Sequence, residues 1–479
     1  MEKRTEIRYN YIEKRTELVG GDTMLHRKIE KEIARWIDGD NRALLLYGVR
    51  QAGKTFVIRK CLKNAGCDYV EFNLVNEPEV VNLLSNATNT DDLILKLSLY
   101  SSKRIEAGVT YIFFDEIQKY KEIVTKIKFL VEDNRYRYIM SGSLLGVEIT
   151  NLKSAPAGYL KSLVMYPLDF EEFVQIFNVP DEVITSIKSA YKEKKPVDDM
   201  IHKKMMELFN LYLIIGGMPA AVEKYRRQNS IDEVIDEHLE IARQYQLDFT
   251  QYEAENRKLI LSNIYELMPA ELNEQNKRFK IADIDKNLRY DRVSDSFVWL
   301  WKAGVALPAF NISQPLLPLM LNQRRSLFKL FFSDVGMLTS LYGKGTKLKI
   351  INGDTDVNKG AVYENVVAQE LTAHGYELYY YNSKKTGELD FIIEDRGQVL
   401  PIEVKSGKDY QKHSALVNVL GEKNYNIEQG LVFSGNNVSR KDNIIYLPLY
   451  MIMCLEKDSF EFEDISIKKF MWHDNLKQE

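Results

Sequence analysis

One segment near the start of the chain joins an apolar run to a glycine-rich loop: Ala43-Leu44-Leu45-Leu46-Tyr47 is followed by Gly48-Val49-Arg50-Gln51-Ala52-Gly53-Lys54-Thr55. The apolar run predicts a buried strand, and G-x-x-x-x-G-K-[ST] after it predicts a phosphate-cradling loop that leads into a helix. Gly48 and Gly53 allow the backbone to turn its N–H groups toward an anion. The N-terminus of the helix adds about half a positive charge. We therefore expect a nucleotide to bind here.

The positions of this loop have separate expected roles. Lys54 is expected to reach the β- and γ-phosphates of ATP and to take part in catalysis, and Thr55 to ligate Mg²⁺. The further residues expected to contact the nucleotide are Gly48, Arg50, Gln51, Ala52, Gly53 and Phe56. The alternative is a chance match of four fixed positions, which the strand before the loop and the helix after it disfavour.

A second apolar run, Tyr111-Ile112-Phe113-Phe114, ends in the acids Asp115 and Glu116. Such a run predicts a strand inside a parallel sheet, whose carboxyl edge is where ligands bind in open α/β folds. Asp115 is expected to hold the Mg²⁺ shell, and Glu116 to polarise the attacking water. A strand that ends in solvated acids is common by itself, but together with the phosphate loop it indicates an ATPase site.

A third predicted strand, residues 136–140, ends in Ser141-Gly142-Ser143. A polar side chain at this strand end senses the γ-phosphate in ATPases of this architecture, and Ser141 or Ser143 fits that role. The same tripeptide is also an ordinary turn, and the sequence does not decide between the two interpretations.

Composition limits the class of protein. At 479 residues the chain is too long for one core and is expected to hold two to four domains. Its net charge of −4 gives no general basic excess, so any contact with DNA or RNA must be a local patch. Cys61, Cys67 and Cys454 have no metal-binding spacing, which favours a reducing cytoplasm. The polar N-terminus has no signal-peptide core, and the apolar stretch 211–222 is too short to span a bilayer, so no membrane partner is expected.

The order of elements predicts an α/β protein of several parts. Residues 1–23 read as an N-terminal extension in which Glu2–Glu6 recurs as Glu13–Glu17. Strands expected near 43–47, 69–74, 111–115 and 136–140 alternate with helices and predict a parallel-sheet ATPase domain over 24–164. A helical lid is expected over 165–254, broken at Gly216–Pro219 near Arg226 and Arg227, and a winged-helix-like region over 255–345. Residues 346–479 form the last predicted domain.

The middle region carries a group of basic residues that could meet phosphates: Lys277, Arg278, Lys280, Lys286, Arg289 and Arg292. Nearby acids offset them: Asp283, Asp285, Asp291 and Asp295. Solvated charges are the favoured interpretation.

A set of acids and a lysine marks the last domain. Residues 389–393 and 399–405 predict two strands of a hairpin, which places Glu403 and Lys405 on one face and Asp390 on the partner strand. Glu364 lies on a preceding predicted helix. Carboxylates of this kind, above all Asp390 and Glu403, can hold a metal ion that polarises a phosphodiester, and the lysine can orient water. The pattern is that of restriction-endonuclease-like, PD-(D/E)xK nucleases, with a metal-free salt-bridged hairpin as the alternative.

These motifs together resemble a widespread group of prokaryotic AAA-type ATPases that carry an N-terminal ATPase domain and a C-terminal domain of undefined function. The resemblance covers nearly all residues from Met24 onward and also includes these segments: 166–168, 171–173, 216–219, 332–336, 363–365, 388–391 and 402–405. It implies ATP binding, hydrolysis and a nuclease-like tail. Many relatives have an arginine where Tyr159 follows Gly158 here. If that arginine acts at the γ-phosphate, this chain must use Arg50 or a residue of a neighbouring subunit.

Two functions follow as hypotheses. In the first, Mg²⁺-dependent ATP hydrolysis repositions the nuclease-like domain, which acts on DNA or RNA. In the second, ATP switches a regulatory protein whose nuclease-like domain is inactive and serves as a docking surface for a protein or for DNA. The sequence leaves the partner and any homo-oligomer open.

Overall fold

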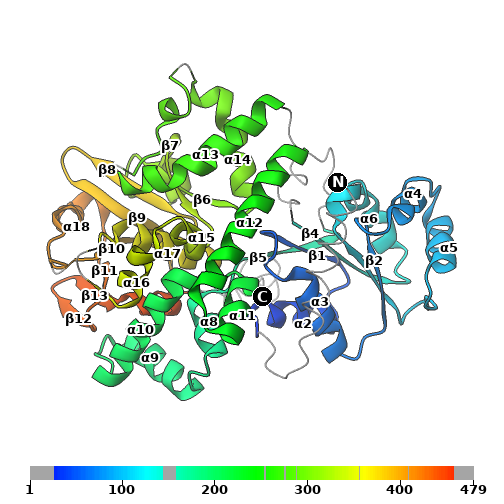
Figure 1. The fold of residues 1–479 in the computed structure, drawn as a ribbon, viewed down its shortest axis with the longest axis horizontal. Helices are drawn as coiled ribbons and strands as arrows, with labels where there is room; N and C mark the ends of the chain where they lie inside the picture. The colour runs from blue at the N-terminus through cyan, green and yellow to red at the C-terminus, as the bar shows by residue number, and fades with distance from the viewer. Residues whose placement is uncertain are drawn as a thin grey trace, which may run out of the picture.

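The computed structural model describes residues 26–143, 158–252, 255–274, 277–286, 288–354, 357–407 and 409–457. The predicted N-terminal extension, residues 1–23, lies outside these ranges. The two β-sheets lie on opposite sides of the described part of the molecule, with helices between and around them (Figure 1).

The first sheet is parallel throughout and has the strand order β2-β3-β4-β1-β5. Its strands are β1 (Ala43–Gly48), β2 (Tyr69–Asn73), β3 (Tyr111–Asp115), β4 (Arg137–Gly142) and β5 (Leu160–Met165). The four strands expected from apolar runs are present, which confirms the predicted parallel α/β sheet. The edge strand β5 was not predicted, because Leu160-Lys161-Ser162-Leu163 lacks a continuous apolar run and only Met165 at its end is fully buried.

Helices cover both faces of this sheet. They are α2 (Ile29–Gly39), α3 (Lys54–Asn64), α4 (Pro78–Ser85), α5 (Thr90–Tyr100), η1 (Ile117–Tyr120) and α6 (Ile123–Glu132). Alternate residues of β1 enter two different cores: Leu44 and Leu46 belong to the core that includes Trp36 of α2, and Leu45 belongs to the core that includes Leu130 of α6. Because strand side chains alternate between faces, β1 is buried on both sides, as its unbroken apolar run predicts.

A helical region follows the first sheet. It comprises α8 (Phe170–Ile176), α9 (Asp181–Glu193), α10 (Asp199–Ile215), α11 (Pro219–Gln228), α12 (Ile231–Tyr252), α13 (Glu255–Asn273), η2 (Ile281–Asp283) and α14 (Tyr290–Lys302). The predicted break is confirmed, since α10 ends at Ile215 and α11 begins at Pro219. A Cβ on Gly217 would lie 2.0 Å from the carbonyl oxygen of Leu168, so the turn packs directly on backbone.

The second sheet has the order β12-β13-β11-β10-β9-β8-β6-β7. Its strands are β6 (Ala306–Ile312), β7 (Gln323–Phe332), β8 (Tyr379–Ser383), β9 (Gly387–Asp395), β10 (Gln398–Val404), β11 (Gly430–Ser434), β12 (Ser439–Lys441) and β13 (Ile444–Pro448). The remaining elements are η3 (Leu319–Asn322), α15 (Val335–Ser340), α16 (Lys344–Ile351), α17 (Gly360–Ala373), α18 (Ser414–Leu420), η4 (Lys423–Tyr425) and η5 (Leu449–Cys454).

The second sheet contains strands from both sides of the domain boundary that the sequence predicts between residues 345 and 346. The hairpin β6–β7 belongs by sequence to the predicted winged-helix-like region, yet β6 pairs in parallel with β8. The sheet is therefore completed by strands from both regions, and a domain boundary at 345 does not follow its hydrogen bonding. The sequence pattern gave no sign of this, because strand pairing over some 70 residues leaves no local mark.

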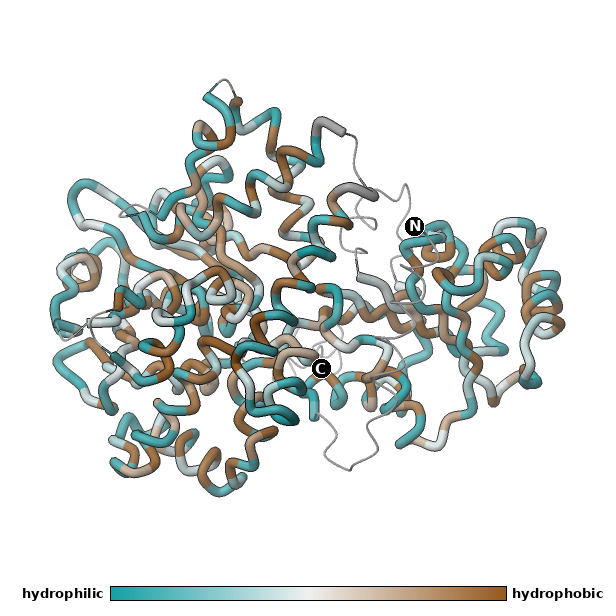
Figure 2. The backbone as a smooth tube through the Cα atoms, viewed as in Figure 1, coloured by the Kyte–Doolittle hydropathy of each residue, from teal (hydrophilic) through white to brown (hydrophobic). Residues whose placement is uncertain are grey.

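One apolar core runs through most of the molecule. It includes Leu44 of the first sheet, Phe209 of α10, Phe331 of the second sheet and Met451 of η5, all of them fully buried. Figure 2 shows the same continuity as hydrophobic stretches along the strands and inner helices of both halves. The two sheets are thus joined by packed side chains.

Candidate functional site

The predicted phosphate loop lies between the end of β1 and the start of α3. Gly48 has φ 142° and Gly53, which caps α3, has φ 91°. These are conformations that glycine adopts at low cost. A Cβ on Gly48 would stand 2.1 Å from the carbonyl oxygen of Met165, so no other residue fits there without movement of β5.

Lys54 turns its amine into this loop. Its Nζ donates to the carbonyl oxygens of Gly48 at 3.0 Å and Val49 at 2.9 Å, and the residue is 8% exposed. Burial lowers the pKa of Lys54 to about 8, although the nearby charges of Glu116 and Asp115 act to raise it. A phosphate would replace the two carbonyls as a stronger, charged acceptor.

Asp115 is the centre of a polar cluster at the carboxyl edge of the sheet. Its Oδ2 accepts from Thr55 Oγ1 at 2.9 Å and Asn73 Nδ2 at 3.3 Å. Its Oδ1 accepts from Ser141 Oγ and from the N–H of Glu116 at 3.0 Å. Burial, followed by the charge of Glu116, raises the pKa of Asp115 to about 7. A cation held by Asp115 and Thr55 would offset that buried negative charge, so these oxygens fit Mg²⁺.

The structure separates the two serines that were candidates for sensing the γ-phosphate. Ser141, expected at the γ-phosphate, bonds to Asp115, while Ser143 lies 3.5 Å from Gln118 Nε2. Asn73 was missed by sequence reasoning. The signal that could have found it is its place at the end of β2, where it pairs in register with Asp115.

Glu116 directly follows β3 and has a left-handed backbone, with φ 56°. Its carboxylate accepts from Gln118 Nε2. The conformation turns Glu116 away from the path of the strand, and left-handed non-glycine residues are concentrated at functional sites.

Helix α12 reaches the phosphate loop. Arg50 pairs with Asp248, and Gln51 Nε2 donates to Gln244 Oε1 at 2.6 Å. The turn before β6 also approaches, since a Cβ on Gly304 would lie 3.1 Å from the nitrogen of Val49. Two of the predicted nucleotide-contacting side chains, Arg50 and Gln51, are therefore held by the helical region in this structure. Phe56, in the first turn of α3, packs partly buried on the shared core.

Arg27 supports the loop from the other side and was not predicted. Its Nη1 donates to Ala52 O at 3.0 Å, its Nη2 to Tyr166 O at 2.7 Å, and its Nε to Glu172 Oε1 at 3.1 Å. Arg27 is 4% exposed, so the guanidinium is fully occupied by buried partners. Its partners are far away in sequence, and no spacing rule could have indicated them.

An ion network, partly exposed at Lys28 and Glu456 and buried at Asp169 and Glu370, continues from there to the C-terminal half. Lys28 Nζ lies 2.8 Å from Asp169 Oδ2 and 3.0 Å from Glu456 Oε1. Asp169 Oδ2 is also 3.3 Å from His374 Nε2, at the end of α17. Glu370 of the same helix accepts from the N–H of Phe170 at 3.0 Å. Helix α17 is thus bonded to the segment that carries Glu172, the partner of Arg27.

The predicted C-terminal set comes together on α17, β9 and β10. Asp390 Oδ2 accepts from the N–H of Val404 at 2.8 Å, and Lys405 Nζ lies 2.9 Å from Glu403 Oε2. Burial, followed by the charge of Asp390, raises the pKa of Glu403 to about 8 and also raises the pKa of Glu364. The charges of Glu403, Asp390 and Glu364 all act to raise the pKa of Lys405, so these side chains belong to one charged cluster.

Two more lysines, both unexpected in this role, reach the same acids. Lys277 pairs with Glu364, and Lys329, which is 0% exposed, lies 2.7 Å from Glu388 Oε1 and 3.9 Å from Glu364 Oε2. The prediction of a solvated charge is wrong for Lys277, because the β6–β7 hairpin brings the middle region onto this cluster. Among the described residues, no group of three or more His, Cys, Asp or Glu side chains has an arrangement that could hold a metal ion.

Three regions of the chain match family models. Residues 40–174 match a model described as an AAA domain. Residues 206–348 and 359–452 match two domains of unknown function, DUF8612 and DUF4143. Among curated proteins, none matches this chain.

Several solved structures are similar over most of their own length. The Walker-type ATPase PABY2304 of Pyrococcus abyssi is 16% identical, with a TM-score of 0.41, 66% of this chain and 96% of that chain covered. The Thermotoga maritima RuvB Holliday junction branch migration motor is 15% identical (TM-score 0.28; 64% and 92% covered). A chain of Drosophila ORC bound to DNA is 14% identical (TM-score 0.27; 67% and 92% covered).

Residues 40–174 therefore form an AAA-type P-loop domain, which rests on the family match and on the geometry of the loop. The C-terminal domain matches a family without a defined function. In the described part of the chain, no single helix has the length and apolar character to cross a membrane, and α10 with α11 meets that criterion only as a pair bent by 117°.

Proposed function

We propose that this protein binds ATP with Mg²⁺ at residues 48–56 and hydrolyses it. The observation that carries the proposal is the contact between Thr55 and Asp115, 2.9 Å apart, beside the buried amine of Lys54. These are the oxygens and the cation that a Mg²⁺–triphosphate needs, at the edge of a parallel sheet where nucleotides bind.

Each residue has one task in the proposed reaction. The loop N–H groups and Lys54 would bind the phosphates, and Thr55 and Asp115 would hold Mg²⁺, whose charge would offset that of the phosphates. Glu116 accepts the proton of a water whose oxygen attacks the γ-phosphorus. The bond between that phosphorus and the β–γ bridging oxygen breaks, and ADP and phosphate leave.

Nucleotide binding and phosphate release test this function together. Lys54→Ala is expected to abolish ATP binding, whereas Glu116→Gln is expected to bind ATP and to lose turnover by about a hundredfold or more. Glu122→Gln, which makes the same change at an exposed acid before α6, is the matched control. Turnover unchanged in Glu116→Gln would remove Glu116 from this role, and ATP binding unchanged in Lys54→Ala would remove the proposal.

We also propose that a change in the bound nucleotide alters the position of the C-terminal domain. It is supported by the path from Ala52 through Arg27 and Glu172 to the segment 169–172, and from Asp169 to His374 of α17. Helix α17 also carries Glu364, so a shift of the loop would be felt where the carboxylate cluster lies. An arginine that completes the ATP site is expected either from Arg50 or from a neighbouring subunit of a homo-oligomer.

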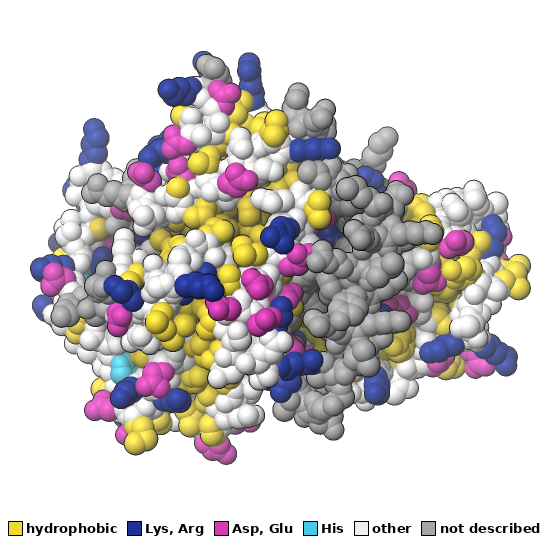
Figure 3. Space-filling model, viewed as in Figure 1, with side chains coloured by type: hydrophobic (Ala, Val, Ile, Leu, Met, Phe, Trp, Pro, Cys, Tyr) yellow, Lys and Arg dark blue, Asp and Glu magenta, His cyan; other side chains and the backbone are white. Residues whose placement is uncertain are grey.

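Two tasks are open for the C-terminal cluster. The order of Glu364, Asp390, Glu403 and Lys405, with all three acidic charges acting on Lys405, supports metal-dependent action on DNA or RNA. This task requires the acids to rearrange around a metal ion, because the described acids form no metal-binding group as they stand. Occupation of the cluster by Lys277 and Lys329 favours a regulatory or docking domain without chemistry, switched by ATP and read by a protein partner. Figure 3 shows basic and acidic side chains interspersed over the face in view, so nucleic acid would have to bind through a local patch.

Titration of Mn²⁺ into the full chain separates these tasks. Binding that is lost in Asp390→Asn but kept in Glu394→Gln, at an exposed acid of the same strand β9, favours the nuclease. If the heat of Mn²⁺ binding is the same in Asp390→Asn as in the unaltered protein, the docking domain is favoured. Phosphate release measured with and without single- and double-stranded DNA and RNA then identifies which partner, if any, stimulates turnover.

A further inference from the structure

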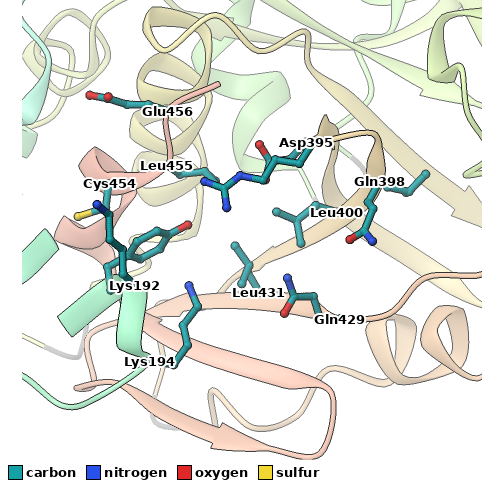
Figure 4. Close-up of a pocket in the computed structure, with 13 residues that line it drawn as sticks. Lys192, Lys194, Asp395, Gln398, Leu400, Gln429, Leu431, Cys454, Leu455 and Glu456 are labelled. Carbon is teal, nitrogen blue, oxygen red and sulfur yellow. The ribbon is translucent and has the colours of Figure 1, made fainter. Parts of the chain in front are cut away.

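A cavity of about 340 Å³ lies apart from the phosphate loop and the carboxylate cluster (Figure 4). It is formed by the end of α9, the β9–β10 hairpin, the start of β11 and the end of η5. Its floor is apolar, because Leu400, Leu431 and Leu455 are all nearly removed from solvent. A volume of a few hundred Å³ with an apolar floor and a few polar groups is the common form of a small-molecule site.

Three cations line this cavity: Lys192, Lys194 and Arg396. Two acids also line it. Asp395 accepts from the hydroxyl of Tyr376 at 2.7 Å and keeps its negative charge near Lys194, whereas Glu456 is paired with Lys28, which does not line the cavity, at 3.0 Å. Three cations and two acids, one of them paired outside, give the lining a positive excess.

Lys194 is the most enclosed of these cations. Its Nζ lies 3.8 Å from the centre of the Tyr191 ring, and Figure 4 shows its side chain reaching into the cavity beside Leu431. Burial lowers the pKa of Lys194, and the nearby positive charge of Arg396 acts in the same direction, while Cys454 and Asp395 act to raise it. Two cations that repel each other across one cavity favour an anion between them. Gln429, opposite Lys194, adds an amide donor.

We propose that this cavity binds a small molecule carrying a phosphate or carboxylate group on an apolar, ring-sized body. The anionic group lies between Lys194 and Arg396, and the body covers Leu400 and Leu431. The site does not depend on the proposed ATPase, since none of its lining residues belongs to the phosphate loop.

Pyridoxal 5′-phosphate is a suitable probe for the full chain. Its aldehyde condenses with an unprotonated lysine amine and releases water, and added borohydride reduces the imine to a stable secondary amine. Pyridoxal, which lacks the phosphate, is the matched probe. Fragmentation mass spectrometry assigns the label, and Lys195, whose side chain is 71% exposed, is the internal control.

The expected result is labelling of Lys194 that is roughly tenfold more efficient with pyridoxal 5′-phosphate than with pyridoxal, since the phosphate adds a charge-assisted contact. Lys195 should not discriminate between the probes. Arg396→Gln should remove the preference at Lys194, and Arg440→Gln, on β12 of the same sheet, should not. Competition by phenyl phosphate or by benzoate distinguishes a phosphate ligand from a carboxylate ligand.

Equal labelling of Lys194 by the two probes would overturn the proposal, because the lysine would then be reactive without an anion site. A preference that survives Arg396→Gln and both competitors would also overturn it. Neither result bears on ATP binding, so a failure here is distinguishable from a failure of the proposed function.

Discussion

The Nη1 of Arg27 lies 3.0 Å from the carbonyl oxygen of Ala52, in the middle of the phosphate loop. The same guanidinium is bonded to the buried carboxylate of Glu172. One side chain thus ties the loop to the segment that leads to the C-terminal half.

Replacement of Arg27 tests whether its contacts with Ala52 and Glu172 stabilise the protein. Arg27→Met leaves Glu172 as a buried, unpaired charge, so we expect a loss of stability on the order of 3 kcal/mol. The midpoint of urea unfolding measures it, and ATP affinity should fall as well. Glu172→Gln added to Arg27→Met should recover part of the stability. Arg35→Met, at a side chain 71% exposed, should change it by less than about 1 kcal/mol. Equal midpoints for the two single variants would contradict this role for Arg27.

Arg50 and Asp248 join the phosphate loop to α12, and their pairing gives a second prediction. If Arg50 serves the γ-phosphate in place of the arginine that relatives carry near Tyr159, it must leave Asp248 when ATP binds. Arg50→Gln should then lower the rate of hydrolysis on the order of a thousandfold. Asp248→Asn should lower it by less than about tenfold, since the arginine is retained.

Single-turnover phosphate release at saturating ATP measures both variants. A rate for Arg50→Gln within a few-fold of the unaltered protein would show that the arginine comes from elsewhere. In that case turnover should rise with protein concentration, as a contribution from a neighbouring subunit requires.

Lys277 pairs with Glu364, and under the proposed nuclease task it would compete with a metal ion for that carboxylate. Lys277→Ala removes a positive charge from the carboxylate cluster, so Mn²⁺ affinity should increase roughly tenfold or more. Calorimetric titration of the full chain measures it, with Asp390→Asn to identify the site. Lys280→Ala, which removes an exposed lysine paired with Glu274, is the control and should leave the affinity unchanged. No Mn²⁺ heat in Lys277→Ala would favour the domain without chemistry.

His374 makes the junction between the domains sensitive to pH. Burial alone would lower its pKa, but the hydrogen bond to Asp169 and the charges of Asp169 and Glu370 outweigh burial, and the pKa of His374 is raised above 6.5. The folded state therefore holds this proton more tightly than the unfolded state. The stabilisation is complete below pH 6.5 and is lost as pH rises through the folded pKa.

The unfolding temperature should accordingly fall above pH 6.5, and His374→Gln should show a smaller fall over the same range. His26→Gln is the matched control, because the side chain of His26 is 54% exposed. If the unfolding temperatures of His374→Gln and of the unaltered protein fall in parallel as pH rises, His374 does not contribute to the pH dependence of stability.

The turn between α10 and α11 has no space for a side chain. A Cβ on Gly217 would meet backbone of Leu168 at 2.0 Å, whereas a Cβ on Gly345, within α16, would meet nothing within 4 Å. Gly217→Ala should therefore lower stability by about 2 kcal/mol or more. Gly345→Ala should be neutral or raise it by up to about 1 kcal/mol. Thermal unfolding of the two variants compares them directly.

The sequence indicated the first domain well because its chemistry imposes local patterns. A buried parallel strand requires a continuous apolar run, and a phosphate cradle requires fixed glycines and a lysine, so Leu44–Leu46 and Gly48–Thr55 could be recognised without a structure. The AAA family match over residues 40–174 agrees. The hairpin of β9 and β10 was equally clear, since Arg396 and Gly397 sit at a tight turn between two alternating strands.

Contacts between distant segments were not predictable. The ion pairs of Arg27 with Glu172 and of Lys277 with Glu364 join residues 145 and 87 positions apart. The sequence does not distinguish a lysine or arginine that is buried in an ion pair from one that is solvated. The packing of the helices on the two sheets determines which of these side chains become buried. The cavity at Lys194 has the same origin, because this lysine follows α9 and Leu431 lies in β11, which are far apart in the sequence.

The pairing of β6 with β8 has a consequence for how this chain can be divided or recombined. A fragment that begins at residue 346 lacks β6 and β7, so β8 would become an outer strand with exposed N–H and C=O groups and a strong tendency to associate with other chains. The last part of the chain is therefore not a portable module. In evolution, as in the laboratory, a functional exchange would have to carry the hairpin 306–332 along with it.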